Sequence, residues 1–161
     1  MKLRNIEIME KDSNKKGDLF GRLMSDFFHT LGYDEPRLNI HKSGREVDLT
    51  SQHRTEQKIA IAECKAHLEL IGGSDINKFI GVIDAEKRKL KKGKTHKGYN
   101  IVGYFISLSG FKETAIEQEN DCDNDRLILI KPDKIIDELI RGRILVSIEY
   151  AISCLSSLST S

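Results

Sequence analysis

Proline is scarce in this chain, with 2 residues among 161, and no linker rich in proline, glycine or serine interrupts its main body. A chain of this length is enough for one sizeable core. We therefore expect residues 1–145 to form one domain. The serine-rich stretch 146–161 is expected to be a terminal helix, or the start of a linker to a further domain that this sequence lacks.

Long apolar runs are also missing, because no stretch approaches the roughly 20 residues that a membrane-spanning helix requires. The first residues, from Met1 to Arg4, do not read as a signal peptide. The 3 cysteines, at positions 64, 122 and 154, are widely spaced and odd in number. That pattern excludes both a disulfide framework and a zinc knuckle, and it suits a reducing cytoplasm. We expect a soluble, cytoplasmic protein that does not contact a membrane.

The hydrophobic periodicity predicts an α/β fold, because strand patterns alternate with helix patterns along the chain. Helices are expected over residues 17–31, 75–92, 112–120 and 132–141, and strands over 37–41, 46–52, 58–66, 101–108 and 126–130. In the first helix, apolar residues recur at intervals of four: Leu19, Leu23, Phe27 and Leu31. Phe20, Met24 and Phe28 widen this apolar stripe. Ser74 is expected to cap the second helix, and Pro132 fits the first turn of the last.

Two of the predicted strands carry the residues of chemical interest. Side chains two residues apart on a strand point to the same face, so Glu63 and Lys65 share one face while Cys64 points to the other. The polar run from His53 to Gln57 resembles a hairpin loop. A hairpin centred between Thr55 and Glu56 places Asp48 directly opposite Glu63.

Two neighbouring carboxylates repel each other when both are ionised, so such a pair either shares a proton or holds a cation. Magnesium fits, because it takes one or two protein carboxylates and completes its shell with water and phosphate oxygens. Asp48, Glu63 and Lys65 thus form a candidate site for metal-dependent phosphodiester hydrolysis. The plainer interpretation is a salt bridge of Lys65 with two acids of an edge strand. The apolar run Ile59 to Ala62 favours the functional interpretation, because charges that end a buried strand are costly.

At these residues the chain resembles the restriction-endonuclease-like nucleases, which carry an acid followed by an acid-x-lysine motif, and in particular their Mrr-like branch. The resemblance covers most of the chain. It comprises the helix from Gly17 to Leu31, the segments Gly44–Leu49 and Ala62–Ala66, and the strand Gly103–Leu108 followed by a polar helix that contains Ala115.

The resemblance implies an α/β three-layer sandwich, in which helices flank a central mixed sheet. It also implies magnesium-dependent endonuclease activity on DNA, with manganese able to substitute. Asp48, Glu63 and the backbone carbonyl of Cys64 would bind the metal, and Lys65 would be the catalytic amine. Many Mrr-like members also carry a glutamate on the first helix, where Gly21 stands here. Asp18 is the nearest substitute, and whether the site binds one or two ions stays open.

The net charge of +1 does not by itself indicate a nucleic-acid-binding protein. Basic residues are concentrated between positions 87 and 97, and others lie near the predicted hairpin. The candidates for contact with DNA phosphates are Lys42, Arg45, Lys58, Lys87, Arg88 and Lys91. The alternative for each is an ordinary solvated charge, since cations favour the end of a helix. His67, two residues beyond Lys65, is a further candidate for the site face.

The leading hypothesis is an endonuclease domain acting on double-stranded DNA, the effector part of a restriction or antiviral defence protein. Cleavage of both strands would need a homodimer, a higher oligomer or successive nicks. A fused NTPase or sensor domain would be the expected neighbour. Two alternatives stay open: a catalytically weak module of the same fold that binds nucleic acid or a partner, and a nuclease for RNA or branched DNA.

Overall fold

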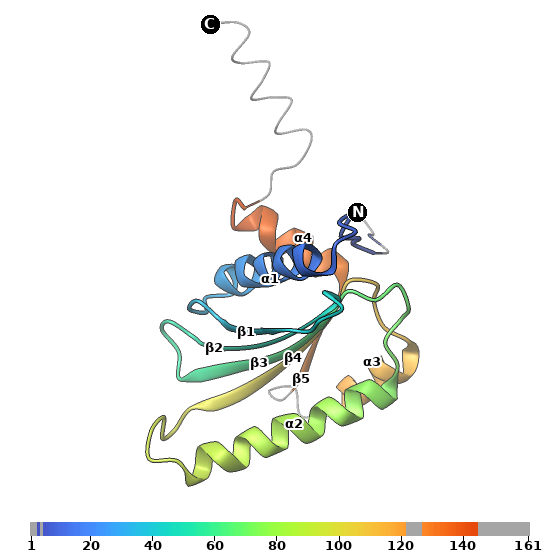
Figure 1. Cartoon of the computed structure of the whole chain (residues 1–161). Helices are drawn as coiled ribbons and strands as arrows, with labels where there is room; N and C mark the ends of the chain where they lie inside the picture. Colours follow the sequence, from blue (N-terminus) through green and yellow to red (C-terminus); the bar gives the residue numbers. More distant parts are fainter. Residues whose placement is uncertain (1–2, 4, 122–126, 145–161) are drawn as a thin grey trace, which may run out of the picture.

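The part of the chain that the computed structural model describes forms a five-stranded mixed sheet covered by helices on both faces (Figure 1). The structure describes residues 3, 5–121 and 127–144, so the predicted terminal segment 146–161 lies outside the described residues. The helices are α1 (Ser13–Thr30), α2 (Gly73–Lys92), α3 (Glu113–Asp121) and α4 (Pro132–Arg141). The strands are β1 (Arg37–Ile40), β2 (Glu46–Gln52), β3 (Lys58–Lys65), β4 (Asn100–Ser107) and β5 (Leu127–Ile130). The predicted α/β class is confirmed.

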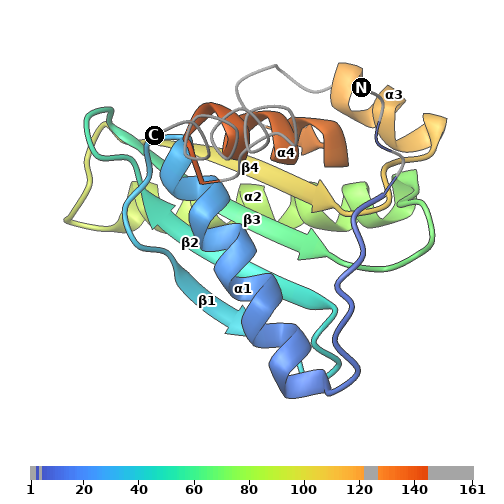
Figure 2. The ribbon, with the colours of Figure 1, turned by 90° about the horizontal axis from the view of Figure 1, so that it is seen from above.

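The strands lie side by side in chain order. β1, β2 and β3 pair antiparallel, whereas β3, β4 and β5 pair parallel. α2 and α3 make the two crossovers beneath one face of the sheet, and α1 and α4 cover the other face (Figures 1 and 2). β3 is therefore the central strand. The plainer interpretation placed Asp48 and Glu63 on an edge strand, and this placement is wrong, because β2 and β3 both lie inside the sheet.

The alternation along β3 divides the core into two halves. Ala60, Ala62 and Cys64 are buried against α1, whose Phe20 and Phe28 belong to the same apolar cluster. In the other half, Ile61 packs with Phe79 and Ile83 of α2. Small side chains on β3 allow the aromatic face of α1 to lie close to the sheet. The prediction that Cys64 is a core residue is confirmed.

The prediction of the core face of α1 from apolar residues four apart is only partly correct. Leu19 is 47% exposed, whereas Phe20, Met24, Phe27 and Phe28 are fully buried. The row that lies on the sheet is the adjacent one, formed by Phe20, Met24 and Phe28, about 100° around the helix from the predicted row. The helix also begins earlier than predicted, because Asp12 accepts a hydrogen bond from the backbone N–H of Lys15 at 2.9 Å.

The prediction that Ser74 caps α2 is wrong. The N-cap is Gly72, and no side chain of α2 caps the first turn. Instead, the backbone N–H of Gly73 donates to the hydroxyl of Thr114, on α3, at 3.1 Å. This partner lies 41 residues away, so local sequence gave no sign of it.

The turn between β1 and β2 is fixed against the start of α1 by Gly44. Its φ is +68°, a conformation that glycine adopts without strain. A Cβ at this position would lie 2.2 Å from the carbonyl oxygen of Ser13. The turn therefore needs glycine both for its backbone and for its closeness to the helix.

Replacing Gly44 with alanine should lower the free energy of unfolding by more than about 1 kcal/mol, because it adds strain and a clash with backbone. The matched control is Gly81→Ala, on the exposed side of α2, where an added Cβ meets nothing within 4 Å. That control should stabilise by about 0.5–1 kcal/mol through helix propensity. Urea unfolding measures both changes, and equal midpoints for the two variants would contradict the account.

Candidate active site

The pairing of β2 with β3 brings the predicted acids together. Asp48 lies directly opposite Glu63, and Glu46 lies opposite Lys65. Their neighbours Val47 and Cys64 are buried toward α1 on the other face of the sheet. The register predicted from the hairpin is confirmed, and the three predicted residues share the face that carries α2.

Lys65 lies between two carboxylates. Its Nζ is 3.2 Å from Oε1 of Glu63 and 3.4 Å from Oε1 of Glu46, and its side chain is 15% exposed. Burial alone would lower the pKa of Lys65, but the two carboxylates outweigh it and raise the pKa above its ordinary value. Lys65 is therefore a charged amine at neutral pH and balances part of the local negative charge.

Two histidines contact the same acids from the flanks of the cluster. His41 Nε2 lies 3.0 Å from Oδ2 of Asp48, and His41 Nδ1 lies 3.7 Å from Oε2 of Glu46. His67 Nε2 is 2.8 Å from Oε1 of Glu46. His67 thus shares the site face, as its spacing predicted. The acids, the amine and both imidazoles form one connected polar network.

The carboxylates differ in how readily they ionise. Burial raises the pKa of Glu63 above its ordinary value, and the charges of Asp48 and Glu46 raise it further against the opposing effect of Lys65. Burial also acts to raise the pKa of Glu46, but the His67 hydrogen bond and Lys65 outweigh it and lower the pKa. A cation between Asp48 and Glu63 would favour the ionised form of both.

Asp48 and Glu63 line a cavity of about 270 Å³ that opens between the sheet and α2. Its wall includes Asp48 and Glu63 from the sheet and Phe79, Val82 and Glu86 from the helix. A larger cavity, of about 580 Å³, is lined by Lys58, Lys87 and Asn100. It lies at the opposite ends of β3 and β4, where Lys58 pairs with Asn100, so it is separate from the acids.

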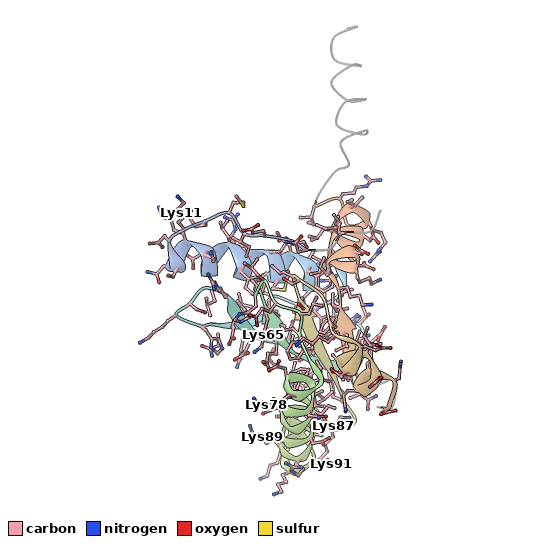
Figure 3. All side chains as sticks on the ribbon, turned by 90° about the vertical axis from the view of Figure 1, so that its right-hand side faces the viewer. Lys11, Lys65, Lys78, Lys87, Lys89 and Lys91 are labelled. Carbon is pink, nitrogen blue, oxygen red and sulfur yellow. The ribbon has the colours of Figure 1, made fainter. Side chains whose placement is uncertain are left out.

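The predicted DNA contacts are spread over several surfaces. Lys42 and Arg45 are exposed in the turn that leads into β2, next to Glu46. Lys58 starts β3 and forms an ion pair with Glu56 at 2.7 Å. Arg88 is exposed on α2. Figure 3 shows Lys87 and Lys91 on one flank of α2, and Lys78 and Lys89 on the other. The predicted set does not form one patch, and contact with DNA stays a prediction for each member.

The first helix does not supply an acid to this cluster. Gly21 faces β1, and a Cβ there would lie 3.2 Å from a methyl carbon of Leu38 and 3.1 Å from one of Ile40. Asp18 is exposed on the same helix, which packs on the opposite face of the sheet from Asp48. Sequence reasoning missed Glu46 and His41. The signal for Glu46 was its spacing, since it lies two residues before Asp48 on one strand.

A comparison with family models identifies the family of the chain. The model of the Mrr catalytic family, described as a restriction endonuclease, matches residues 13–139, which contain every residue of the network. The chain belongs to this family. The resemblance inferred from Asp48, Glu63 and Lys65 is thereby confirmed. No curated protein matches the chain.

Two solved structures are similar in fold to this chain. The DNA modification-dependent restriction endonuclease AspBHI is 13% identical, with a TM-score of 0.46, and the match covers 96% of this chain and 41% of that one. The MspJI restriction endonuclease, solved in complex with a 27-mer oligonucleotide, is 11% identical, with a TM-score of 0.43. That match covers 81% of this chain and 29% of MspJI. This chain thus spans less than half the length of either protein.

Among the described residues, no helix is long and apolar enough to cross a membrane. Within the same part of the chain, no group of three or more histidine, cysteine, aspartate or glutamate side chains is arranged to hold a metal ion. The donors present are two carboxylates with a neighbouring amine.

Substituting Lys65 with methionine should destabilise the metal-free protein more at neutral pH than near pH 5. Burial already raises the pKa of Glu63, and without the amine that opposes this shift the folded-state pKa of Glu63 rises further above the unfolded value. A carboxyl group with a raised folded pKa binds its proton more tightly when folded, so stability recovers as pH falls through that pKa. Urea unfolding in a chelator measures the difference. Lys78→Met, an exposed change on α2, should show little dependence on pH, and equal dependence in the two variants would contradict this account.

Proposed function

We propose that this chain is a magnesium-dependent endonuclease domain that hydrolyses phosphodiester bonds in DNA. The observation that carries the proposal is the pairing of Asp48 with Glu63 across β2 and β3, beside the amine of Lys65, in a member of a restriction endonuclease family. Two carboxylates that line a cavity, with an amine beside them on the same sheet face, are the groups that metal-assisted hydrolysis needs.

The donor set fits a hard divalent cation. Magnesium keeps several waters and takes one or two protein carboxylates, so Asp48 and Glu63 suffice without a third acidic ligand. The raised pKa of Glu63 indicates that its charge lacks full compensation. Manganese prefers similar oxygen ligands and should substitute. The backbone carbonyl of Cys64, which lies between Glu63 and Lys65, is the proposed additional ligand.

Each residue has a distinct role in the proposal. Asp48 and Glu63 would hold the ion, which when bound would acidify a water molecule and neutralise charge on a phosphate. Lys65 would orient a water molecule or bind a phosphate oxygen through its charged amine. His41 engages one oxygen of Asp48 and so fixes the orientation of that carboxylate.

We further propose double-stranded DNA as the substrate and a role in restriction or antiviral defence. The family assignment supports DNA, and MspJI was solved with an oligonucleotide. One site cuts one strand, so a double-strand break requires a homodimer, a higher oligomer or successive nicks. A fused NTPase or sensor domain, if present in the full protein, would control when the site acts.

Cleavage of supercoiled plasmid tests the chemistry. With magnesium or manganese, the wild-type chain should nick or linearise the plasmid, and Asp48→Asn, Glu63→Gln and Lys65→Ala should each lose more than about a hundredfold in rate. Glu117→Gln removes an exposed acid of α3 and should keep full activity. Calorimetry should show magnesium binding to the wild type, and at least about tenfold weaker binding after Glu63→Gln.

Other outcomes would select a different function. No cleavage together with no metal binding would favour a module of this fold that binds nucleic acid or a partner. Clear metal binding without plasmid cleavage would point to RNA, to branched DNA or to a missing activator, and labelled RNA and branched-DNA substrates separate these cases. Wild-type rates in all three variants would overturn the assignment of the site.

Neutralising Lys42 and Arg45 together should weaken DNA binding and lower its dependence on salt. Each bound phosphate releases counterions, so the slope of log affinity against log salt should fall by about one for each phosphate that the variant no longer neutralises. Fluorescence anisotropy with calcium in place of magnesium measures binding without cleavage. Lys131→Gln, an exposed change at the start of α4, is the matched control. An unchanged slope in the double variant would remove these residues from the DNA interface.

A further inference from the structure

We infer that Glu46 is a positioning residue of this site, which holds the amine of Lys65 in place from the side opposite Glu63. The inference rests on the proposed function. Glu46 begins β2 and lies directly opposite Lys65 in the register of β2 and β3. Its Oε1 atom is 3.4 Å from Lys65 Nζ, and Oε1 of Glu63 is 3.2 Å from the same nitrogen.

The position of Glu46 is itself fixed by its surroundings. His67 Nε2 contacts Oε1 at 2.8 Å, and His41 Nδ1 lies 3.7 Å from Oε2. The backbone of His67 is in turn held, because its carbonyl accepts a hydrogen bond from the buried hydroxyl of Ser109, beyond the end of β4. The side chain of Glu46 is 28% exposed, so these contacts are partly shielded from water. A carboxylate held from both sides is a suitable anchor for a flexible amine.

Lys65 needs such an anchor because of its own side chain. A lysine amine sits on a four-carbon stem with many rotamers, so a single contact fixes it weakly. The amine bridges Glu63 and Glu46. A cation held by Asp48 and Glu63 would compete with Lys65 for the Glu63 carboxylate and weaken that contact. Glu46 would then keep the amine beside the site.

This role differs from that of a metal ligand. Glu46 pairs with Lys65 and not with Glu63 in the sheet, and His67 and Lys65 both contact its Oε1. It therefore acts on the reaction through Lys65. Loss of Glu46 should slow the chemical step, while the affinities for DNA and magnesium stay close to those of the wild type.

The test is Glu46→Gln, which keeps the shape of the side chain and removes its charge. We expect kcat on an oligonucleotide duplex to fall about tenfold to a hundredfold, with KM and the calorimetric affinity for magnesium changed less than about twofold. In a Lys65→Ala background the same substitution should have no further effect on kcat, because the two residues act as a unit. Glu117→Gln is the matched control, and urea unfolding checks that each variant is folded.

A second measurement does not depend on cleavage. Carbon-13 relaxation at Cε of Lys65, in protein with labelled lysine and with magnesium added, should report an ordered side chain in the wild type and a mobile one in Glu46→Gln. If the wild type cleaves nothing, the proposed function fails, whereas the relaxation result still supports or overturns the positioning role. An unchanged kcat, a large loss of magnesium affinity, independent effects of the two substitutions, or equal mobility in both proteins would overturn the inference.

Discussion

The register between β2 and β3 is the constraint on which the site depends. A shift of one residue would turn Asp48 toward α1 and place Val47 in water. Burial prevents such a shift, because Val47, Leu49 and Cys64 fill the core beneath α1 while Ile61 fills the core above α2. The apolar faces of two strands thus determine where their polar side chains meet. The chemistry of the site follows from the packing of the core.

The second constraint is electrostatic. Two unit charges 4 Å apart interact by about 4 kcal/mol at an effective dielectric constant near 20. Three carboxylates on one face would therefore not stay ionised together without compensation. Lys65 and the two histidines supply part of it, while burial, together with the charges of Asp48 and Glu46, keeps the pKa of Glu63 raised. Perturbed pKa values of this kind are common at functional sites, and the divalent cation proposed for this site would supply the remaining positive charge.

Much of this arrangement was predictable from local patterns. The alternation along residues 58–66 separated Cys64 from Glu63 and Lys65, and the hairpin centre at Thr55 and Glu56 gave the pairing with Asp48. These predictions succeeded because strand periodicity and hairpin geometry act over a few residues. The prediction of the Ser74 cap failed because the first turn of α2 is satisfied by Thr114 of α3. The prediction that Leu19 belongs to the core face of α1 failed, because the surface on which a helix packs determines which of its faces is buried.

The sequence by itself determined the fold class, the family and the three residues at the centre of the candidate site. Their spacing on two adjacent strands is a local property, and a local property can be predicted from the order of the residues in a short segment. Tertiary structure decided which other groups surround them. His41, Glu46 and His67 meet because a turn, a strand start and a strand exit converge at one end of the β2–β3 pair. Tertiary structure also decided that Gly21 faces β1, where the closeness of α1 to the sheet leaves little room for a side chain. Contacts of this kind depend on how distant segments pack together, which no short stretch of sequence specifies.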